Sequence, residues 1–421
     1  MYYCFFCFYY LPFYDKARIR IIFALCWKIS KCVDICFAPI TALVAVYTKE
    51  GEKMKKGLSF VFMLLLVGCN DKYIIEEVGF LHSLGLDVEK SSDVDEYLVT
   101  GVIPQIAPDA KNNRELLTSV SSSDKEALLD LARQSNRDVA NGQLRNVLFG
   151  KELAEEGIQE NIRTMNRDPK FGTRVQVVVV NGQANDLLSQ PYTQHPEASQ
   201  YIDALLEKEA RLNNIPETRM HQFTRDLYDD GIDPVTPILR RGEDTVVLDG
   251  IALFDNAKYV EKIDPKSSRI FFFLLGNYSA GSLHLELGKG EDDKTIQLLF
   301  DSIQNTREMT IKNADDTEKM KIDIQISIKG SLVEYNGPLD ITNKKDLRTL
   351  ETELENIVEN RARHLLSVLQ AQGVDSIGVG KRVRNSLSYA DWESLNWKET
   401  FQNIEINPHV EAEIINIGIF S

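Results

Sequence analysis

Cysteine is missing from most of this chain. All six cysteines of the 421-residue sequence lie within its first 69 residues, and residues 70 to 421 contain none. The part of the chain that follows Cys69 therefore has neither a disulfide nor a thiolate metal site. Cys69 is also the only cysteine that would remain if everything before it were removed.

Histidine is scarce and scattered. No two of the six histidines are separated by three to five residues, so the spacing typical of a protein zinc site is missing. There is also no GxSxG nucleophile elbow. The acidic pairs are neighbours in the sequence and would point in different directions on a regular element, so we expect them to be solvated surface charges. These pairs are Glu76/Glu77, Glu155/Glu156 and Asp229/Asp230.

The glycine-rich stretch from Gly373 to Lys381 resembles a phosphate-binding loop only in outline. Asp375 stands where such a loop needs its first glycine, and Arg382 stands where it needs Ser or Thr to bind magnesium. These two substitutions exclude a nucleotide site. We expect a flexible turn from a helix to a strand instead.

Basic residues are fewer than acidic residues after residue 68. The stretch up to Gly68 holds nine of the 48 Lys and Arg and four of the 63 Asp and Glu, which leaves a formal charge of −20 from Cys69 onward. A surface this acidic repels nucleic-acid phosphates and anionic lipid headgroups. We therefore expect no nucleic-acid partner, and attachment to a membrane has to come from something other than a basic patch.

A secretory signal is present, although it begins at Met54. The sequence MKKGLSFVFMLLLVGCNDK has two lysines, an apolar stretch of 11 residues from Leu58 to Gly68, and then Cys69. Such a stretch is short of the roughly 20 residues that a membrane-spanning helix needs, which favours a cleaved signal over residues 54–68. The sequence LVGC has the form of a bacterial lipobox, so we predict that Cys69 is the lipid attachment site. Two acyl chains hold a protein stably at a membrane.

Residues 1–53 fit neither a signal peptide nor a clean membrane span. They are rich in aromatic residues, and charged residues interrupt their apolar stretches. One interpretation is a membrane-proximal extension of the protein. The other, which we favour because a signal works at the true N-terminus, is that translation starts at Met54 and that residues 1–53 are a non-native upstream extension.

The first region after the signal, residues 69–232, alternates predicted strands with predicted helices, which indicates an α/β-type domain. The run of apolar residues at 175–180 is typical of a strand that is buried on both faces. Ser123 and Glu126 have the spacing of a capping box, so a helix is expected from about residue 124 to 137. The other strands are expected at 73–86, 96–106 and 146–149, and the other helices at 153–162, 198–212 and 218–228.

A concentration of turn residues from Asp229 to Pro237 indicates a boundary. The second region, residues 245–421, is expected to be an α+β domain with an antiparallel sheet and one long helix at 345–370. Isoleucine alternates with polar residues at 322–328, which is typical of a strand with one buried face. Further strands are expected at 246–254, 269–275 and 410–419. Phe271 to Phe273 could be core or a patch that faces a partner, and we favour core.

Four stretches, two in each half of the chain, carry a resemblance to a known family. The lipobox followed by YIIEEVGFLHSLGLDV and later GKELAEEGIQENIRTMNRDPKFGTRVQVVVV resembles the N-terminal region of Ger(x)C (GerAC-like) spore germination lipoproteins. The stretches LETELENIVENRARHLLSVLQAQGVDSIGVG and YADWESLNWKETFQNIEINPHVEAEIINIG are similar to the C-terminal region of that family. The resemblance covers nearly everything after Cys69 and does not cover residues 1–53.

The resemblance implies a three-domain α+β lipoprotein without catalytic residues or cofactors, the C subunit of a spore germinant receptor. Its expected partners are the A and B membrane subunits of that receptor. Its expected place is the outer face of the spore inner membrane, with the diacylglyceryl anchor on Cys69. Two other classes stay open from the residues alone: a solute-binding lipoprotein that delivers a small ligand to a transporter, and a cell-wall hydrolase with a carboxylate pair.

Overall fold

The computed structural model describes residues 77–90, 95–105, 114–193, 195, 198–276, 278–279, 281–289, 293–314, 316 and 319–417, all of which belong to one compact unit. Cys69 and residues 1–68 lie outside the described residues. No helix within the described ranges is long and apolar enough to cross a membrane.

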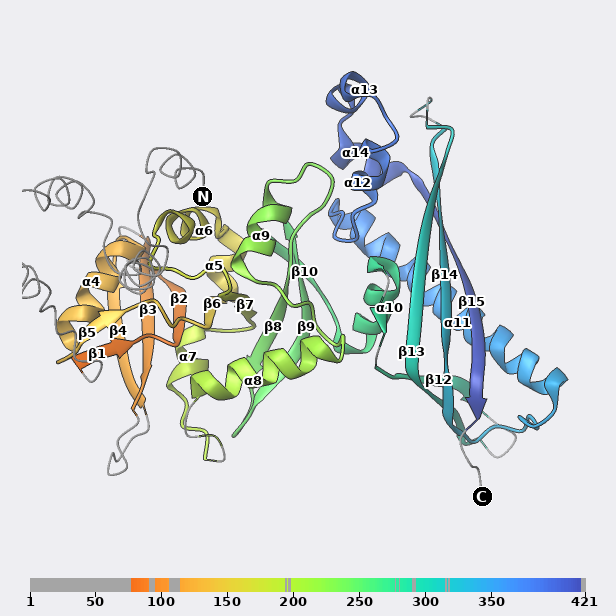
Figure 1. Cartoon of the computed structure of the whole chain (residues 1–421), viewed down its shortest axis with the longest axis horizontal. Coiled ribbons are helices and arrows are strands. Elements are labelled where there is room, and N and C mark those ends of the chain that lie inside the picture. The colour runs from red at the N-terminus through yellow and green to blue at the C-terminus, as the bar shows by residue number, and fades with distance from the viewer. Residues whose placement is uncertain are drawn as a thin grey trace, which may run out of the picture. The chain divides into compact units, whose positions relative to one another are not determined.

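The N-terminal part of the described chain, residues 78–263, is called the first fold. It is built on an eight-stranded sheet (Figure 1). The strand order is β10-β9-β8-β7-β6-β2-β3-β4. The four strands at its centre, β2, β6, β7 and β8, pair in parallel, and the strands toward both edges pair antiparallel. The bounds are β2 Ser83–Lys90, β3 Asp95–Pro104, β4 Arg114–Ser121, β6 Asn146–Gly150, β7 Gln176–Val180, β8 Val235–Arg241, β9 Val246–Asp255 and β10 Lys258–Ile263. Two short strands, β1 Val78–Phe80 and β5 Asp138–Ala140, pair separately.

Helices cover both faces of this sheet. Val177 and Val179 of β7 belong to one core cluster, whereas Val178 and Val180 belong to another on the opposite face. Because successive side chains of a strand point to opposite faces, the apolar run is explained by burial on both sides. One cluster takes residues from α4 Asp124–Gln134, α5 Lys151–Glu156, α6 Gln159–Arg167 and α9 Met220–Leu227, and the other takes them from α7 Ala184–Ser189 and α8 Ala198–Arg211.

Local sequence sets two of the helix boundaries. The hydroxyl of Ser123 accepts the N–H of Glu126 at 3.3 Å and begins α4, as the capping-box spacing predicts. The single helix expected at 153–162 is two helices, α5 and α6. Gly157 lies between them with φ +122°, a conformation that ends a helix, and the N–H of Ile158 donates to Ala257 O at 2.9 Å.

The C-terminal part of the described chain, residues 265–417, is called the second fold. It is a smaller sheet with one long helix, α11, packed on it (Figure 1). Ile322, Ile324, Ile326 and Ile328 of β14 are fully buried on the side that carries α11. The strand order is β11-β13-β14-β15, and β12 also pairs with β13. The bounds are α10 Pro265–Leu275, β11 Tyr278–Ser279, β12 Leu283–Lys289, β13 Thr295–Lys312, β14 Lys321–Tyr335, α11 Lys344–Gln372, α12 Val379–Arg384, α13 Tyr389–Ser394, α14 Trp397–Asn403 and β15 Glu405–Ile417.

Two expectations for this region are wrong. β14 and β15 pair in parallel, so the sheet is mixed rather than antiparallel. The chain crosses from the end of β14 through α11 to α14 before β15 begins, and such a long crossover allows a parallel pair. Residues 269–275 form the C-terminal part of helix α10 rather than a strand, and Pro265 stands in the first turn of that helix.

The core prediction for the phenylalanine run is confirmed. Phe271 and Phe273 are fully buried and Phe272 is 7% exposed, and all three belong to the core shared with α11. The α+β fold class with an N-terminal α/β domain is also confirmed. The first sheet continues through β9 and β10 to Ile263. The hydrogen bonding of this sheet therefore runs past residues 229–237, the stretch in which the turn residues indicated a boundary.

Candidate functional site

Two segments that are distant in the sequence lie against each other in the folded chain. Residues 226–233 lead from the end of α9 toward β8, and residues 374–384 lead from the end of α11 through α12. We call these two segments together the clasp. Its backbones are joined directly, because the N–H of Lys381 donates to Gly231 O at 2.9 Å.

The backbones of the clasp approach so closely at Gly231 and Gly380 that neither position has room for a side chain. A Cβ on Gly231 would lie 2.5 Å from Lys381 N and 2.7 Å from the Gly380 carbonyl carbon. A Cβ on Gly380 would lie 2.8 Å from Gly231 Cα and 2.5 Å from Trp397 Nε1. Glycine at these positions is thus a requirement of packing, not of a turn.

The loop between α11 and α12 is built around Asp375. Gly373 ends α11 in the left-handed region at φ +65°, and Gly378 precedes α12 at φ +74°. The Asp375 carboxylate accepts the N–H of Val379 at 2.9 Å and the N–H of Gly380 at 2.6 Å. It thereby satisfies backbone donors that the first turn of α12 leaves unpaired.

Asp375 is almost completely buried and is held by neutral groups. It is 2% exposed, and Trp397 Nε1 donates to its Oδ2 at 3.2 Å. Removal from water disfavours the charged carboxylate and raises the pKa of Asp375 to about 7, although the hydrogen bonds from Gly380 and Val379 work in the opposite direction. The neighbouring carboxylate of Asp233 raises the pKa further.

Asp233 joins the other side of the clasp to this loop. Its backbone N–H donates to Asp375 O at 3.0 Å, and its Oδ2 accepts the N–H of Asp375 at 2.7 Å. Burial raises the pKa of Asp233 to about 6, against the hydrogen bonds from Asp375 and Asn256 and the charge of Lys398. The Asp233 carboxylate is thus bonded to the backbone of Asp375, at the point where the two segments exchange hydrogen bonds.

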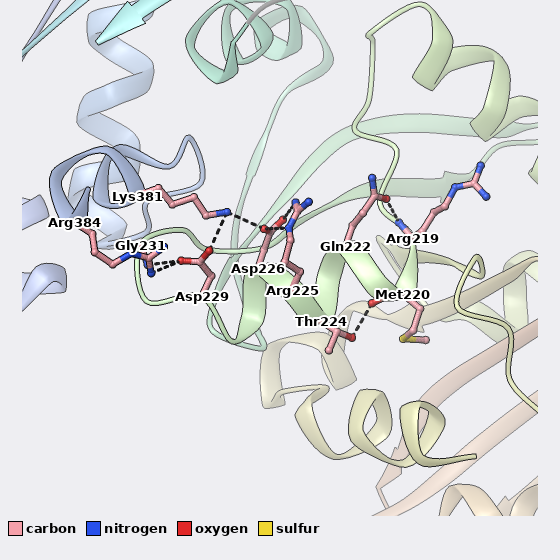
Figure 2. Close-up of polar contacts among 10 residues, drawn as sticks. All are labelled: Arg219, Met220, Gln222, Thr224, Arg225, Asp226, Asp229, Gly231, Lys381 and Arg384. Atoms are coloured by element: carbon pink, nitrogen blue, oxygen red, sulfur yellow. Dashed lines mark hydrogen bonds and ion pairs between the residues drawn. The ribbon is translucent and has the colours of Figure 1, made fainter. Parts of the chain in front are cut away.

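A group of ion pairs joins the two segments of the clasp (Figure 2). Asp229 Oδ2 lies 3.2 Å from Lys381 Nζ, and Asp229 Oδ1 lies 2.9 Å from Arg384 Nη1. Lys381 Nζ also lies 3.3 Å from Asp226 Oδ1. Burial opposes the ionised form of Asp229, but hydrogen bonds from Gly231 N–H, Arg384 and Lys381 outweigh it and hold the pKa of Asp229 below its usual value.

Arg307 of β13 ties the same loop to the second sheet. Its guanidinium donates from Nη1 to Leu274 O at 2.6 Å and to Ile377 O at 3.0 Å. Leu274 lies near the end of α10, and Ile377 lies in the loop of the clasp. The clasp is therefore fastened to both folds, to the first through residues 226–233 and to the second through Arg307.

A cavity of about 290 Å³ opens beside the clasp. Its volume is near the lower end of the range for small-molecule sites. The side chains that line it are mostly acidic or aromatic. They come from Leu227, Tyr228, Asp229, Asp230, Ile232, Asp233, Asp255, Asn256, Gly373, Asp375, Trp397, Lys398 and Phe401.

The carboxylates of the clasp are already engaged by other groups. The Asp375 carboxylate is occupied by backbone and indole donors, and Asp229 is occupied by two cations. Neither carboxylate faces a candidate nucleophile at hydrogen-bond distance, which a general base needs. Across the ranges that the structure describes, no group of three or more His, Cys, Asp or Glu side chains could hold a metal ion.

The structure corrects two expectations about these residues. The stretch from Gly373 to Lys381 was expected to be a flexible turn into a strand, but Val374, Asp375, Ser376 and Ile377 are each at most 2% exposed, and the chain continues into α12. Apolar side chains draw this loop into the core. Asp229 was expected to be a solvated charge, yet its side chain is 17% exposed and ion-paired.

Sequence reasoning therefore missed the clasp, although it had noticed both of its segments. The predicted lipid site Cys69 lies outside the described residues, so its role stays a prediction. The sequence does contain a feature that marks Asp375 as unusual. This aspartate lies between two glycines, has apolar neighbours, and precedes a Gly-Lys pair by five residues. No sequence pattern pairs it with Asp233, because that contact spans 142 positions.

Two family profiles match the chain in sequence order. The profile described as "Spore germination protein N-terminal domain" matches residues 71–241, and the profile described as "Spore germination B3/ GerAC like, C-terminal" matches residues 249–418. The clasp takes one of its two segments from each matched region.

Individual relatives are similar over nearly their whole lengths. Spore germination protein GerQC of Bacillus cereus is 23% identical over 368 residues, which cover 87% of this chain and 99% of that protein. Spore germination protein KC of Bacillus subtilis (strain 168) is 21% identical over 403 residues, covering 87% of this chain and 97% of that protein. A solved structure described as "Crystal Structure of the GerBC protein" shares the fold, with a TM-score of 0.51 at 15% identity over 79% of this chain and 97% of that chain.

Proposed function

Since the chain belongs to the GerAC-like (Ger(x)C) family of spore germination proteins in both its N-terminal and its C-terminal region, we propose that it is the lipid-anchored, non-catalytic C subunit of a germinant receptor. In this role it acts in nutrient-triggered spore germination together with A and B membrane subunits. Its place is the outer face of the spore inner membrane.

The order and extent of the family matches carry this proposal. Residues 71–241 and 249–418 match the two successive domains of the family, and the alignment with GerQC reaches 99% of that protein. A chain that had kept one domain and lost the other would support a shared fold without a shared role. Agreement over both domains supports the role of the whole subunit.

The signal and lipobox of residues 54–69 support the lipid anchor. The surface after Cys69 carries a formal charge of −20 and is unsuited to anionic headgroups. Two acyl chains on Cys69 would supply the stable attachment that the acidic surface cannot. The carboxylates of the clasp are already used in hydrogen bonds and ion pairs, which supports a non-catalytic role.

The cavity beside the clasp favours a second candidate, a solute-binding lipoprotein that delivers a small ligand to a transporter. A volume of about 290 Å³ would admit a small solute. Solute-binding proteins, however, close two similar lobes on their ligand, whereas the two folds here differ in strand order and helix content. Titration calorimetry with single nutrients would favour this candidate if one of them bound to the purified chain.

The anchor is tested by changing Cys69 to Ala. We expect the wild-type chain to sediment with membranes and to show the mass of a diacylglyceryl adduct, and the Cys69→Ala chain to be released without that mass. Intact-mass measurement and membrane fractionation give the two readouts.

Ser59→Ala is the matched control, because it changes a residue within the signal and leaves the lipobox unchanged. It should behave as wild type. If Cys69→Ala stays on the membrane with an unchanged mass, the anchor at Cys69 is wrong. The solute-binding role would then have to be tested without assuming an anchor.

A further inference from the structure

The outer side of two helices on the first fold carries a basic surface that the function proposed above does not use. α4 and α6 contribute to the same core cluster, so they cover the same face of the first sheet (Figure 1). Asn161 Nδ2 of α6 donates to both carboxylate oxygens of Asp124 in α4, at 2.9 and 3.0 Å. Lys125 of α4 and Phe171, which follows α6, line the same small hollow. The two helices therefore present one continuous outer surface.

The exposed side chains on this surface are mainly cationic. In α4 the residues at positions 125, 129 and 133 are exposed and recur at intervals of four, which places them on one side of the helix. In α6 Arg163 and Arg167 have the same spacing and are also exposed. We call the following set of exposed residues the basic face: Lys125, Leu129, Arg133, Arg163, Arg167 and Lys170. Its five cations outnumber the exposed carboxylates of the two helices, Glu126 and Glu160.

The cations of the basic face can take an anion from outside the chain. Within the ranges that the structure describes, Lys125, Arg167 and Lys170 form no ion pair. Arg133 and Arg163 pair with carboxylates of their own helices, in exposed contacts that contribute little stability. No strong internal contact therefore competes with an anionic partner at this surface.

The predicted anchor keeps the basic face close to a membrane. Cys69 precedes Glu77, the first described residue, by eight positions, and eight residues span at most about 28 Å. Glu77 leads into β1, where a Cβ on Gly79 would lie 3.3 Å from the Cβ of Arg137, three residues after the end of α4. An acylated Cys69 thus holds α4 within reach of the lipid surface in which its acyl chains are buried.

We propose that the basic face lies against the membrane surface that holds the anchor and binds its anionic lipid headgroups. This inference rests on the lipid anchor proposed above and names the side that the anchored chain turns toward the bilayer. The headgroup phosphates contact the five cations, and Leu129, which is 62% exposed, enters the boundary between headgroups and acyl chains. The acyl chains supply the attachment, and the basic face supplies the orientation.

The formal charge of −20 after Cys69 does not prevent this contact. Screening limits the influence of an exposed charge to about 8 Å at physiological ionic strength, so the headgroups respond to the surface that touches them. Each Lys or Arg near an anionic membrane adds to the attraction. The acidic remainder of the surface is repelled by the same headgroups, which favours one orientation over the others.

Amine footprinting of the wild-type chain tests this orientation. The chain expressed from Met54 would be labelled with an amine-reactive ester in detergent, in vesicles of phosphatidylcholine, and in vesicles of phosphatidylcholine and phosphatidylglycerol in equal amounts. We expect Lys125 and Lys170 to react several times more slowly on the anionic vesicles than in detergent or on the neutral vesicles. Lys345, an exposed lysine at the start of α11, should react equally fast in all three. Peptide mass spectrometry gives the rate at each lysine.

Two variants separate the basic face from exposed apolar residues in general. Leu129→Glu puts a negative charge in the middle of the basic face and should remove the protection of Lys125 and Lys170. Val120→Glu is the matched control, because Val120 is 48% exposed on β4 but points away from α4. Its neighbours Ser119 and Ser121 are the residues that face Asp130 of that helix. Val120→Glu should keep the protection.

Equal reaction of Lys125 and Lys170 on anionic vesicles and in detergent would overturn the proposal, and so would equal protection of Lys345. Protection in native membranes but not on lipid vesicles would assign the basic face to a protein partner and would also overturn it. A missing acyl mass on Cys69 is a separate result, which contradicts the anchor alone. Coupling the Cys69 thiol, the only one from Met54 onward, to a maleimide lipid then restores the tether, and the same labelling rates decide the proposal.

Discussion

At the scale of single residues, the clasp depends on two positions that have no side chain. Gly231 and Gly380 allow two backbones to touch, and the first Cβ added at Gly231 would meet main-chain atoms rather than a movable side chain. The main chain cannot yield as a side chain can, so the strain would have to be relieved by moving one segment away from the other.

Gly231→Ala is therefore expected to destabilise the chain by about 2 kcal/mol, the typical cost of forcing an extra group into a packed site. Gly142→Ala is the control, because a Cβ there meets no atom within 4 Å. Its effect should stay below about 0.5 kcal/mol. Urea unfolding followed by circular dichroism measures both values, and equal effects would contradict the close approach at Gly231.

Asp87 offers a second test at the same scale. Its carboxylate accepts the N–H of Ala184 at 2.7 Å and the N–H of Asn185 at 2.8 Å, and burial raises its pKa to about 6. The folded chain thus binds the Asp87 proton more tightly than the unfolded chain does. The contribution of Asp87 to stability is fully present below about pH 4 and is lost as the pH rises toward 6.

Asp87→Asn should remove this part of the pH dependence, because an amide cannot ionise. The amide keeps one acceptor oxygen and loses the acceptor for the second backbone N–H, so the variant should also be less stable than the wild type at both pH values. The free energy of unfolding, measured at pH 4.5 and pH 7, should fall less in the variant than in the wild type. A difference on the order of 1 kcal/mol is expected. The same slope in both chains would show that Asp87 ionises normally in the fold.

At the scale of elements, β15 illustrates how a free sheet edge is closed. Its outward N–H groups at Ala412 and Ile414 donate to Glu355 Oε1 at 3.1 Å and to Glu351 Oε1 at 2.9 Å on α11. Arg348 lies within 3.3 Å of both carboxylates. Side chains that cover an edge in this way prevent another strand from pairing there.

Replacing Glu351 and Glu355 together with Ala should speed hydrogen exchange of the Ala412 and Ile414 amides about tenfold, since a hydrogen bond contributes about 1 kcal/mol. Glu359→Ala is the matched control, because Glu359 pairs with Arg363 on the same helix. Mass spectrometry with peptide resolution over β15 gives the readout. Exchange that is unchanged in the double variant, or equally fast in the control, would rule out the covering role.

The same scale shows what sequence patterns can predict. Strict alternation identified β14, and the unbroken valine run identified β7 as a strand buried on both faces. The strands that were not predicted include β4, β8, β10, β12 and β13. In β13 the apolar residues follow no constant period, and the strand carries two register shifts. The run from Arg269 to Leu275 was interpreted as a strand, because a segment that is buried on all sides has no period to distinguish helix from strand.

At the scale of the whole molecule, the two regions and their family could be predicted from sequence, whereas their connection could not. Arg384 and Asp229 are 155 positions apart, and no local preference brings them together. The turn residues at 229–237 were interpreted as a boundary between domains. Residues 229–233 of that stretch belong to one of the two segments of the clasp. Polar residues at a turn are often exposed to solvent, but Asp229 and Asp233 form hydrogen bonds with residues of the segment 374–384.

The proposed receptor role is tested most directly by nutrient-triggered germination of spores that lack this chain. The fall in optical density after addition of single nutrients would be compared in wild-type spores, in deleted spores, and in deleted spores supplied with the wild-type or the Cys69→Ala chain. We predict that the deletion abolishes the response to at least one nutrient, that the wild-type chain restores it, and that Cys69→Ala restores it only weakly. A deletion that leaves the response to every nutrient unchanged would contradict the account.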